Sequence, residues 1–303
     1  MSDLTPAAAP GPENAVMRSM MTVPVIVQRF VDKAPAAGAD AICLDLEDSI
    51  PPAEKAAARP LARQAIETMP RSGFAMYVRV NGYTTGLTED DLDAVVRPGL
   101  DGIVLSKAES PQMIADLDAH LGRLEARHGI EIGHVAIVPL IETAKGMMEA
   151  YDVCRASPRA AGAIFGAEDF ATDMAIKRTD TAEEVLWARS MVAVACHAAG
   201  IAALDTPDPN YSDEAHLRRE MTKARSLGYT GKLCIHPGQV QIANEIFSPA
   251  DDEVTEARAI VEAFEREGLA KGIAAIAVDG KMIDTPIYWR ARRLVEWAEA
   301  SKS

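Results

Sequence analysis

The sequence of 303 residues is poor in cysteine, in positive charge and in long apolar runs, and each shortage excludes a class of protein. Its four cysteines are far apart and form no CxxC pair, which argues against a zinc site or a disulfide framework and favours a reducing compartment. The net charge of −14 argues against a nucleic-acid partner, because binding to polyphosphate requires clustered lysine and arginine. No stretch reaches the roughly 18 unbroken apolar residues of a membrane span, so no membrane partner is expected.

The first 15 residues are rich in alanine and proline, and they lack the basic start and apolar run of a secretory signal. We expect a disordered tail over residues 1–15 and a cytoplasmic protein. A core as large as this chain can build needs no disulfides. The sequence therefore predicts a globular protein whose structure begins near residue 16.

Short apolar runs alternate with amphipathic segments along most of the chain. Continuous apolarity within a run is typical of a parallel sheet covered on both faces. Eight such units favour a (β/α)8 TIM barrel, although a doubly wound sheet shows the same alternation. The predicted strands lie near residues 22–27, 40–46, 74–80, 102–106, 134–140, 161–166, 201–204 and 230–235. The predicted helices lie near residues 28–37, 53–68, 88–97, 110–128, 143–155, 181–199, 212–226 and 237–246.

The pattern changes after residue 250, so we predict a barrel over residues 16–250 and a C-terminal extension over 251–303. A charged helix near 251–268 leads to an apolar run at 273–278, a turn at 279–281 and a last helix from about residue 285. Because this helical extension lies outside the eight units, we interpret it as a lid or a subunit-docking arm.

Six of the predicted strands end in a charged or polar cluster. In a TIM barrel the C-terminal ends of all strands meet at one mouth, where catalytic groups collect. The mouth would therefore gather several carboxylates, an arginine and a lysine, which favours an enzyme over a binding module. The clusters occupy residues 42–48, 77–81, 103–107, 138–143, 164–169 and 233–237.

Glu142 and Asp169 are the first candidates for chemistry, because each follows a predicted strand directly. Two carboxylates without a histidine or cysteine cluster suit a hard cation such as Mg²⁺, with waters and substrate oxygens completing the octahedron. Isolated acids more often cap helices or pair with arginine. Their position at adjacent strand ends of one mouth favours the metal site.

Asp45 and Glu47 share one face of their strand, and two acids this close require a cation or hydrogen-bond donors nearby. We interpret Glu47 as holding a water molecule of the metal. Asp48 and Ser49 are interpreted as capping the next helix.

Arg79 lies inside an apolar strand, and a buried cation must be paired. It would bind an anionic substrate group or neutralise the neighbouring acids. Lys107 has the same two alternatives, and its acidic surroundings favour electrostatic support over a Schiff base. The small residues of segment 166–169 form a turn whose N–H groups could face a substrate carboxylate, which is a weak signal alone.

Together these segments resemble the citrate lyase beta-subunit-like family, which includes malyl-CoA, citramalyl-CoA and citryl-CoA lyases. The resemblance runs from about Arg18 to the C-terminal helix. The segments that carry it are 18–19, 38–48, 78–81, 98–103, 141–143, 165–169, 231–237 and 279–284.

The resemblance implies a Mg²⁺-dependent barrel that cleaves or forms a carbon–carbon bond of a short 3-hydroxyacyl-CoA through an enolate. Glu142 and Asp169 would bind Mg²⁺, with Glu47 on a metal water. Arg79 would stabilise the enolate or thioester oxygen. Asp284 would donate or accept a proton at a neighbouring subunit's mouth, in a homotrimer or larger homo-oligomer. The partners would be a 2-oxo acid and a CoA thioester, and the substrate contacts would come from Arg18, Arg79, Lys107, Gly166, Ala167, Glu168 and Asp169.

The sequence departs from the family in three places. Val25 and Ile26 follow Pro24 where the family has a glycine near the expected CoA phosphates, Ser106 replaces a proline, and segment 204–210 is less apolar than usual. Three further readings therefore stay open. They are a malyl-CoA-type thioesterase, a CoA-independent 2-oxo-acid aldolase, which the altered first loop favours, and a non-enzymatic protein that holds a dicarboxylate.

Overall fold

The computed structural model describes residues 16–71, 73–278 and 280–300, so the predicted disordered tail at 1–15 lies outside the described residues. The chain folds into two compact units, a larger one over Met17–Phe247 and a smaller one that includes residues 248–300. Over the described residues, no helix has both the length and the apolarity required to cross a membrane.

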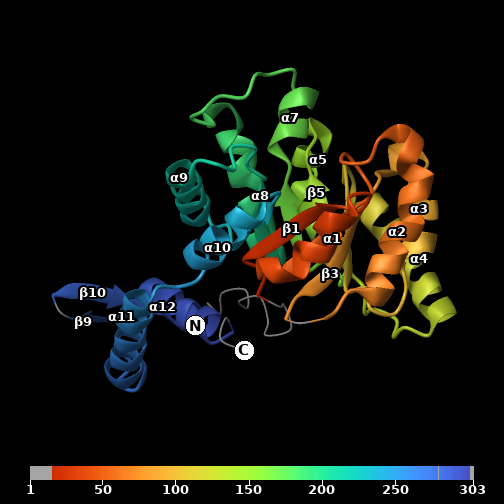
Figure 1. The fold of residues 1–303 in the computed structure, drawn as a ribbon. Coiled ribbons are helices and arrows are strands. Elements are labelled where there is room, and N and C mark those ends of the chain that lie inside the picture. The colour runs from red at the N-terminus through yellow and green to blue at the C-terminus, as the bar shows by residue number, and fades with distance from the viewer. Residues whose placement is uncertain (1–15, 72, 279, 301–303) are drawn as a thin grey trace. The chain divides into compact units, whose positions relative to one another are not determined.

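The larger unit is a closed barrel of eight strands that pair in chain order, and β1 pairs with β8 in parallel to close it (Figure 1). All neighbouring strands are parallel, which confirms the predicted (β/α)8 architecture. Each strand begins within two residues of the start of a predicted strand, except β1, which begins three residues before its predicted start. The strands are β1 (Ser19–Pro24), β2 (Ala41–Asp45), β3 (Ala75–Val80), β4 (Gly102–Leu105), β5 (Ala136–Ile141), β6 (Gly162–Phe165), β7 (Ala202–Asp205) and β8 (Gly231–Cys234).

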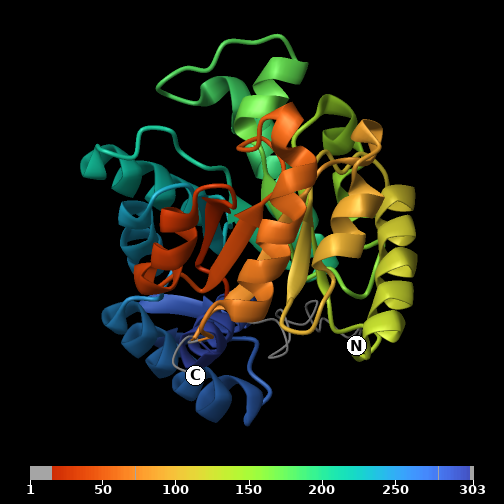
Figure 2. The same cartoon turned by 45° about the vertical axis from the view of Figure 1, so that its right-hand side comes forward.

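Helices surround the strands of this unit on the outside (Figures 1 and 2). The predicted helix at 143–155 is two short helices, and α7 follows β6 where the sequence suggested only a turn. The α-helices are α1 (Gln28–Lys33), α2 (Lys55–Thr68), α3 (Thr88–Val95), α4 (Pro111–His128), α5 (Ala144–Met148), α6 (Ala150–Cys154), α7 (Ala167–Asp173), α8 (Leu186–Ala199), α9 (Glu214–Ser226) and α10 (Pro237–Ile246). Short 3₁₀ helices are η1 (Ala34–Ala37), η2 (Pro52–Glu54), η3 (Tyr83–Thr85) and η4 (Glu183–Val185).

The core of this unit has two layers, because successive side chains of a strand point to opposite faces. A large cluster fills the space between strands and helices, and a smaller one fills the barrel interior with residues such as Cys43, Val104, Leu140, Ile164 and Leu233. Burial of each large aliphatic side chain contributes about 1.5–3 kcal/mol. The same alternation points the next inward side chains at the barrel mouth.

The smaller unit contains α11 (Asp251–Ala263), the π-helix η5 (Phe264–Leu269), β9 (Ala275–Val278), β10 (Lys281–Asp284) and α12 (Thr285–Ala300). Its strands pair antiparallel, and Gly280 supplies a left-handed φ of 77° next to their connection. Phe264, Ile276, Ile283 and Tyr288 form its apolar centre. The prediction of a helical extension is therefore incomplete, because a β-hairpin occupies the segment predicted as an apolar run and a turn.

Candidate active site at the carboxyl ends of the barrel strands

A cavity of about 200 Å³ lies at the carboxyl ends of the barrel strands. Its lining combines four acids and one arginine with apolar side chains. The residues are Thr22, Asp48, Arg79, Leu140, Glu142, Gly166, Ala167, Glu168, Asp169, Thr206, Pro207, Leu233 and Ile235. The predicted collection of charged strand ends at one mouth is therefore present in the structure.

Arg79 forms a bidentate ion pair with Asp45 on the neighbouring strand, with both nitrogen–oxygen distances at 2.7 Å. Its third nitrogen, Nη1, lies 3.2 Å from Oε2 of Glu47. Burial opposes ionisation of Asp45, but Arg79 outweighs it and holds the pKa of that carboxyl below its usual range. Of the two alternatives for Arg79, neutralisation of neighbouring acids is the one that the structure shows directly.

Hydrogen bonds to the side chains of Asp45 and Lys55 hold the loop that carries Glu47. Asp45 accepts hydrogen bonds from the backbone N–H of Glu47 and of Ser49, at 2.9 and 3.1 Å. Lys55 Nζ donates to the carbonyl of Glu47 at 2.7 Å and to Oδ1 of Asn81 at 2.7 Å. Lys55 lies inside a predicted helix and had no signal in the sequence, whereas Asn81 ends one of the predicted strand clusters.

The interpretation of Asp48 and Ser49 as helix caps is wrong. Helix α2 begins at Lys55 after the short η2, and its N-cap position is Glu54. Asp45 instead stabilises this loop through the bonds to its carboxylate described above, because it lies close enough to the turn to accept two backbone N–H groups.

Glu47 and Lys107 face each other across the mouth. Burial raises the pKa of Glu47 to about 7, with Asp48 and Asp45 adding to the effect and Arg79 opposing it. Lys107 Nζ lies 3.9 Å from Glu47 Oε1 and 3.5 Å from Asp169 Oδ1. Burial disfavours the charged ammonium, but Asp169 and Glu47 raise the pKa of Lys107 overall, which supports an electrostatic role over a Schiff base.

Glu142 is buried at 2% exposure, and one of its oxygens accepts a bond from the backbone N–H of Lys107 at 2.9 Å. Burial, together with the negative charges of Asp169 and Glu47, raises its pKa well above the usual range. A Cβ atom at Gly166 would lie only 2.6 Å from Oε2 of Glu142. Glycine is therefore required at position 166, because any side chain would displace this carboxylate.

Of the predicted nest at 166–169, the backbone N–H groups of Gly166 and Ala167 are engaged within the protein, while those of the remaining two residues stay a prediction. Gly166 N–H donates to the carbonyl of Ile141 at 3.0 Å, and Ala167 N–H donates to Thr206 Oγ1 at 3.0 Å. Both residues line the cavity as the start of α7, where small side chains permit close packing on Glu142. A substrate carboxylate therefore finds these two donors already engaged.

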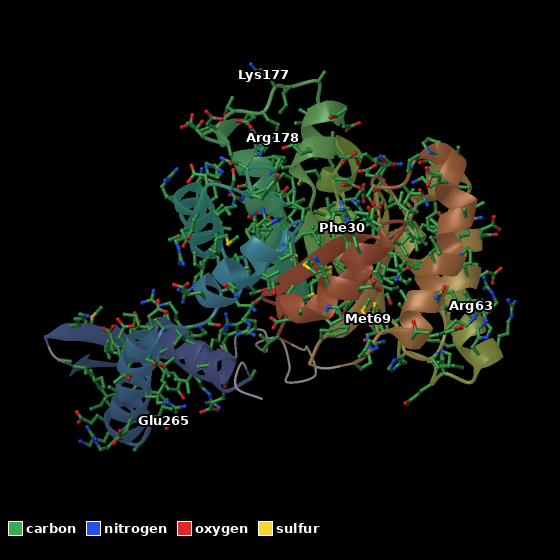
Figure 3. All side chains as sticks on the ribbon, viewed as in Figure 1. Phe30, Arg63, Met69, Lys177, Arg178 and Glu265 are labelled. Carbon is green, nitrogen blue, oxygen red and sulfur yellow. The ribbon has the colours of Figure 1, made fainter. Side chains whose placement is uncertain are left out.

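Glu168 and Asp169 differ although they are adjacent in α7. The Glu168 carboxylate accepts a bond from Arg178 Nε at 3.0 Å, and Arg178 lies on the segment beyond α7 together with Lys177 (Figure 3). Asp169 keeps 32% of its side chain exposed and faces Lys107. Glu168 is the more exposed of the two at 55%, but its carboxylate is engaged by Arg178, whereas Asp169 shares the cavity with Glu142 and has only the longer ion pair with Lys107 at 3.5 Å.

Two predicted site residues lie elsewhere. Arg18 precedes β1 at the opposite end of that strand from the cavity, and its guanidinium bonds to both oxygens of Asp40 at 2.9 and 2.7 Å. Asp284 ends β10 in the smaller unit, where its carboxylate accepts a hydrogen bond from Ile287 N–H at 3.2 Å. The barrel cavity therefore includes neither of them in its lining.

The donor set of the cavity fits Mg²⁺, which does not require a site built wholly from protein ligands. Across residues 16–71, 73–278 and 280–300, no group of three or more His, Cys, Asp or Glu side chains is arranged to hold a metal ion. Mg²⁺ needs only one or two carboxylates when waters and substrate oxygens supply the rest. Glu142 and Asp169 line one cavity, and the unbalanced charge around Glu142 favours a cation there.

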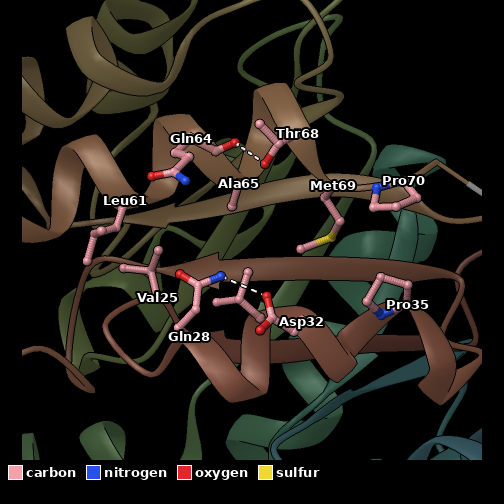
Figure 4. Close-up of a pocket in the computed structure, with 11 residues that line it drawn as sticks. Val25, Gln28, Asp32, Pro35, Leu61, Gln64, Ala65, Thr68, Met69 and Pro70 are labelled. Carbon is pink, nitrogen blue, oxygen red and sulfur yellow. Dashed lines mark hydrogen bonds between the residues drawn. The ribbon is translucent and has the colours of Figure 1, made fainter.

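A second cavity, of about 180 Å³, lies between α1 and α2 and includes Val25 in its wall (Figure 4). Its only acid is Asp32, which accepts a hydrogen bond from Gln28 Nε2 at 2.8 Å. This cavity lacks the converging carboxylates of the barrel mouth and is not the candidate active site. It does show that Val25 packs into the apolar layer around the barrel.

The fold and the acidic cavity together define a TIM-barrel enzyme. The family described as HpcH/HpaI aldolase/citrate lyase matches residues 18–237, and the chain belongs to this family. The predicted citrate lyase beta-subunit-like relationship is thereby confirmed. Membership of this family also confirms the expectation that the protein is an enzyme and not a non-enzymatic binding protein.

Three relatives show the range of the similarity. The citrate lyase subunit beta of Leuconostoc mesenteroides subsp. cremoris is 36% identical over 284 residues, which cover 94% of each chain. The (3S)-malyl-CoA thioesterase of Cereibacter sphaeroides is 33% identical over 286 residues, covering 93% of this chain and 95% of that protein. The structure of CitE from Mycobacterium tuberculosis in complex with magnesium, acetoacetate and coenzyme A superimposes with a TM-score of 0.76 at 27% identity, covering 94% and 99% of the two chains.

Proposed function

We propose that this protein is a Mg²⁺-dependent carbon–carbon lyase that cleaves or forms a short 3-hydroxyacyl-CoA, such as malyl-CoA, citramalyl-CoA or citryl-CoA, through an enolate. The observation that carries the proposal is the convergence of Arg79, Glu142 and Asp169 in one cavity. Membership of the family and the magnesium and coenzyme A in the related CitE structure support it.

Glu142 and Asp169 are the residues that would hold Mg²⁺, which supplies a Lewis acid for the carboxylate and carbonyl of a 2-oxo acid. Lys107 contributes positive charge beside Asp169, and its backbone N–H fixes the orientation of Glu142. Glu47, held by its loop contacts, would accept a hydrogen bond from a water molecule of the metal. These groups orient the 2-oxo acid before any bond changes.

Arg79 meets the negative charge that develops on the thioester oxygen as the carbon–carbon bond breaks. Its two bonds to Asp45 fix the guanidinium plane before substrate arrives. Donors that are fixed in advance stabilise charge without reorganisation during the reaction. The ion pair seen in the structure and the substrate role proposed from the sequence are therefore compatible.

Proton transfer requires a further group, because the acids of the cavity are assigned to the metal or engaged in ion pairs. We assign this role to Asp284. The smaller unit would then act as a lid or docking arm that brings Asp284 to the mouth of a neighbouring subunit, in a homotrimer or larger homo-oligomer. A single subunit would be inactive on this account.

A second candidate is hydrolysis of a malyl-CoA-type thioester, which the similarity to a (3S)-malyl-CoA thioesterase favours. It needs the same oxyanion stabilisation by Arg79 and a water molecule in place of the second carbon substrate. A CoA-independent 2-oxo-acid aldolase is favoured only by Val25, which is buried at 1% exposure where the family pattern has a glycine.

A product panel separates these activities. Hydroxyacyl-CoA thioesters are incubated with the protein and Mg²⁺, and the products are identified by mass. A lyase yields an acyl-CoA and a 2-oxo acid, a thioesterase yields free coenzyme A and a hydroxy acid, and an aldolase acts on hydroxy acids without coenzyme A. The proposal fails if no carbon–carbon bond is cleaved or formed by the wild type under conditions in which Mg²⁺ binds.

A further inference from the structure

The ammonium group of Lys55 makes three hydrogen bonds beside the loop that carries Glu47. Its Nζ atom donates to the backbone carbonyls of Leu46 and Glu47 at 3.1 and 2.7 Å, and to Oδ1 of Asn81 at 2.7 Å. A lysine has three N–H donors, so these contacts use all of them. The three acceptors are neutral oxygens, so the contacts fix the loop and do not neutralise an acid.

Helix α2 does not explain a lysine at this position. Lys55 is the first residue of α2, and the first turn of this helix contains no acidic residue. The N-terminal end of a helix carries a partial positive charge, so a cation is unfavourable there. The contacts with the loop therefore account for Lys55 better than the helix that carries it.

The contacts of Lys55 belong to a buried network that includes the end of β3. Asn81 donates through Nδ2 to the carbonyl of Leu46 at 2.9 Å and to Oδ2 of Asp91 at 2.7 Å. Asp91 in turn pairs at 2.8 Å with Arg59, which lies one turn after Lys55 on α2. Leu46, Asn81 and Asp91 are exposed at 2% or less. Because every step of this network is buried and hydrogen-bonded, it holds the loop in one position.

Two side chains hold the backbone of Glu47 through different groups. Asp45 accepts the backbone N–H groups of Glu47 and Ser49, whereas Lys55 donates to the carbonyl of Glu47. The Glu47 carboxylate faces the mouth, where Arg79 Nη1 lies 3.2 Å from it. The position of this carboxylate therefore depends on both anchors.

We propose that Lys55 is a positioning residue that acts through Glu47. By binding two successive backbone carbonyls, it fixes the carboxylate that would accept a hydrogen bond from a water molecule of Mg²⁺. This inference rests on the proposed function, because it takes the role of Glu47 from there. It assigns an effect on Mg²⁺ affinity to a lysine that does not line the cavity.

The first test measures Mg²⁺ affinity by titration calorimetry in the presence of pyruvate. Lys55→Met keeps the length of the side chain and removes the ammonium group. Loss of a positive charge would by itself strengthen the binding of a cation. The proposal predicts the opposite, a weakening by about tenfold, because groups that orient the partners of a metal typically contribute about 10–100-fold to its affinity. Unchanged or stronger binding would overturn the proposal.

A double-mutant cycle determines whether Lys55 acts through Glu47. Glu47→Gln should weaken Mg²⁺ binding by about 10–100-fold, and adding Lys55→Met to it should cause no further loss. Losses that multiply would mean that Lys55 acts independently of Glu47, which refutes the positioning role. Lys223→Met is the matched control, because Lys223 Nζ also donates to a backbone carbonyl, that of Thr181 at 3.0 Å. This control should bind Mg²⁺ as wild type does.

Hydrogen exchange of the metal-free protein tests the loop itself. The amides of Glu47 and Ser49 are protected by their bonds to Asp45, and Lys55→Met should raise their exchange rates by about tenfold, since a lost bond to a charged group is worth at least this factor. Lys223→Met should not change them. Unchanged rates in Lys55→Met would overturn the proposal. A loss of protection throughout the barrel would also overturn it, because Lys55 would then serve the fold as a whole.

The binding outcomes separate two failures. If Mg²⁺ binds equally to wild type and Lys55→Met, only the role of Lys55 is refuted. If wild type binds no Mg²⁺ in the presence of pyruvate, the metal site of the proposed function is refuted, and the role of Lys55 fails with it.

Discussion

Two buried acids of the barrel, Asp205 and Glu142, show opposite electrostatic environments. Asp205 receives two bonds from Arg189, at 2.8 and 2.9 Å, and one from Lys232 at 2.9 Å. Burial opposes its ionisation, but Lys232 and Arg189 outweigh burial and lower its pKa. Glu142 is equally enclosed, yet it faces Asp169 and Glu47, and its pKa is raised.

The difference follows from which face of the strand each acid occupies. Asp205 alternates with the inner-cluster residue Leu204 and so points outward, where Arg189 of α8 meets it. Glu142 follows Leu140 by two residues and points toward the mouth. A fully compensated acid is part of the structural framework, whereas an uncompensated one awaits a cation. Buried charge alone therefore does not identify a functional residue.

Asp169→Ala is expected to have the largest effect, which is a loss of turnover. This change removes one of the two proposed Mg²⁺ ligands while leaving Asp205 and its partners intact. Turnover and Mg²⁺-dependent binding of the 2-oxo acid should both be lost, and the fold should be retained by circular dichroism. Unchanged activity would exclude Asp169 as a metal ligand.

Asp284→Asn is expected to reduce turnover next most strongly, by roughly 10²–10⁴-fold, which is the usual contribution of a positioned acid or base. Affinity for the 2-oxo acid with Mg²⁺ should be unchanged, because the proposed role of Asp284 is proton transfer and not binding of the metal or the 2-oxo acid. Steady-state kinetics and calorimetry on the same preparation separate the two quantities. Equal losses of binding and turnover would refute a role in proton transfer.

Asp205→Asn and Glu142→Gln should change stability in different ways. Asp205→Asn leaves Arg189 and Lys232 with a buried excess of positive charge and should lower the free energy of unfolding by about 3–5 kcal/mol. Glu142→Gln removes an uncompensated acid and should leave the stability of the metal-free protein equal or higher. Urea denaturation without divalent cations measures both. The comparison between the two acids fails if Glu142→Gln is destabilised as much as Asp205→Asn.

The pH dependence of stability is the smallest expected effect. The pKa of Glu47 is about 7 in the folded protein and near 4.5 when unperturbed, so the folded state binds more protons between these values. The free energy of unfolding of the metal-free protein should therefore fall as the pH rises from about 5 to 8. The lowered pKa values of Asp45 and Asp205 act only at more acidic pH. Burial also raises the pKa of Glu142, which adds to the slope in the same direction, so Glu47→Gln should reduce the slope without abolishing it, and an identical slope would contradict this assignment.

The strands and most helices of the barrel were predictable because apolar periodicity reports which faces are buried. Helix α7 was missed because the small residues at 166–167 suggest a turn when their packing on Glu142 is unknown. The ion pair of Arg79 with Asp45 joins neighbouring strands, so the sequence could only offer it as one alternative. Lys55 carried no signal, since its contacts are with backbone carbonyls that come together only after folding.

The central claim is that Glu142 and Asp169 at the mouth form a Mg²⁺ site. Calorimetric titration of Mg²⁺ into the wild-type protein in the presence of pyruvate tests it most directly, with Glu142→Gln and Asp205→Asn as the matched pair. The account predicts one Mg²⁺ per chain for wild type and for folded Asp205→Asn, and no binding for Glu142→Gln. Equal Mg²⁺ binding by Glu142→Gln and wild type, or none by the wild type, would contradict it.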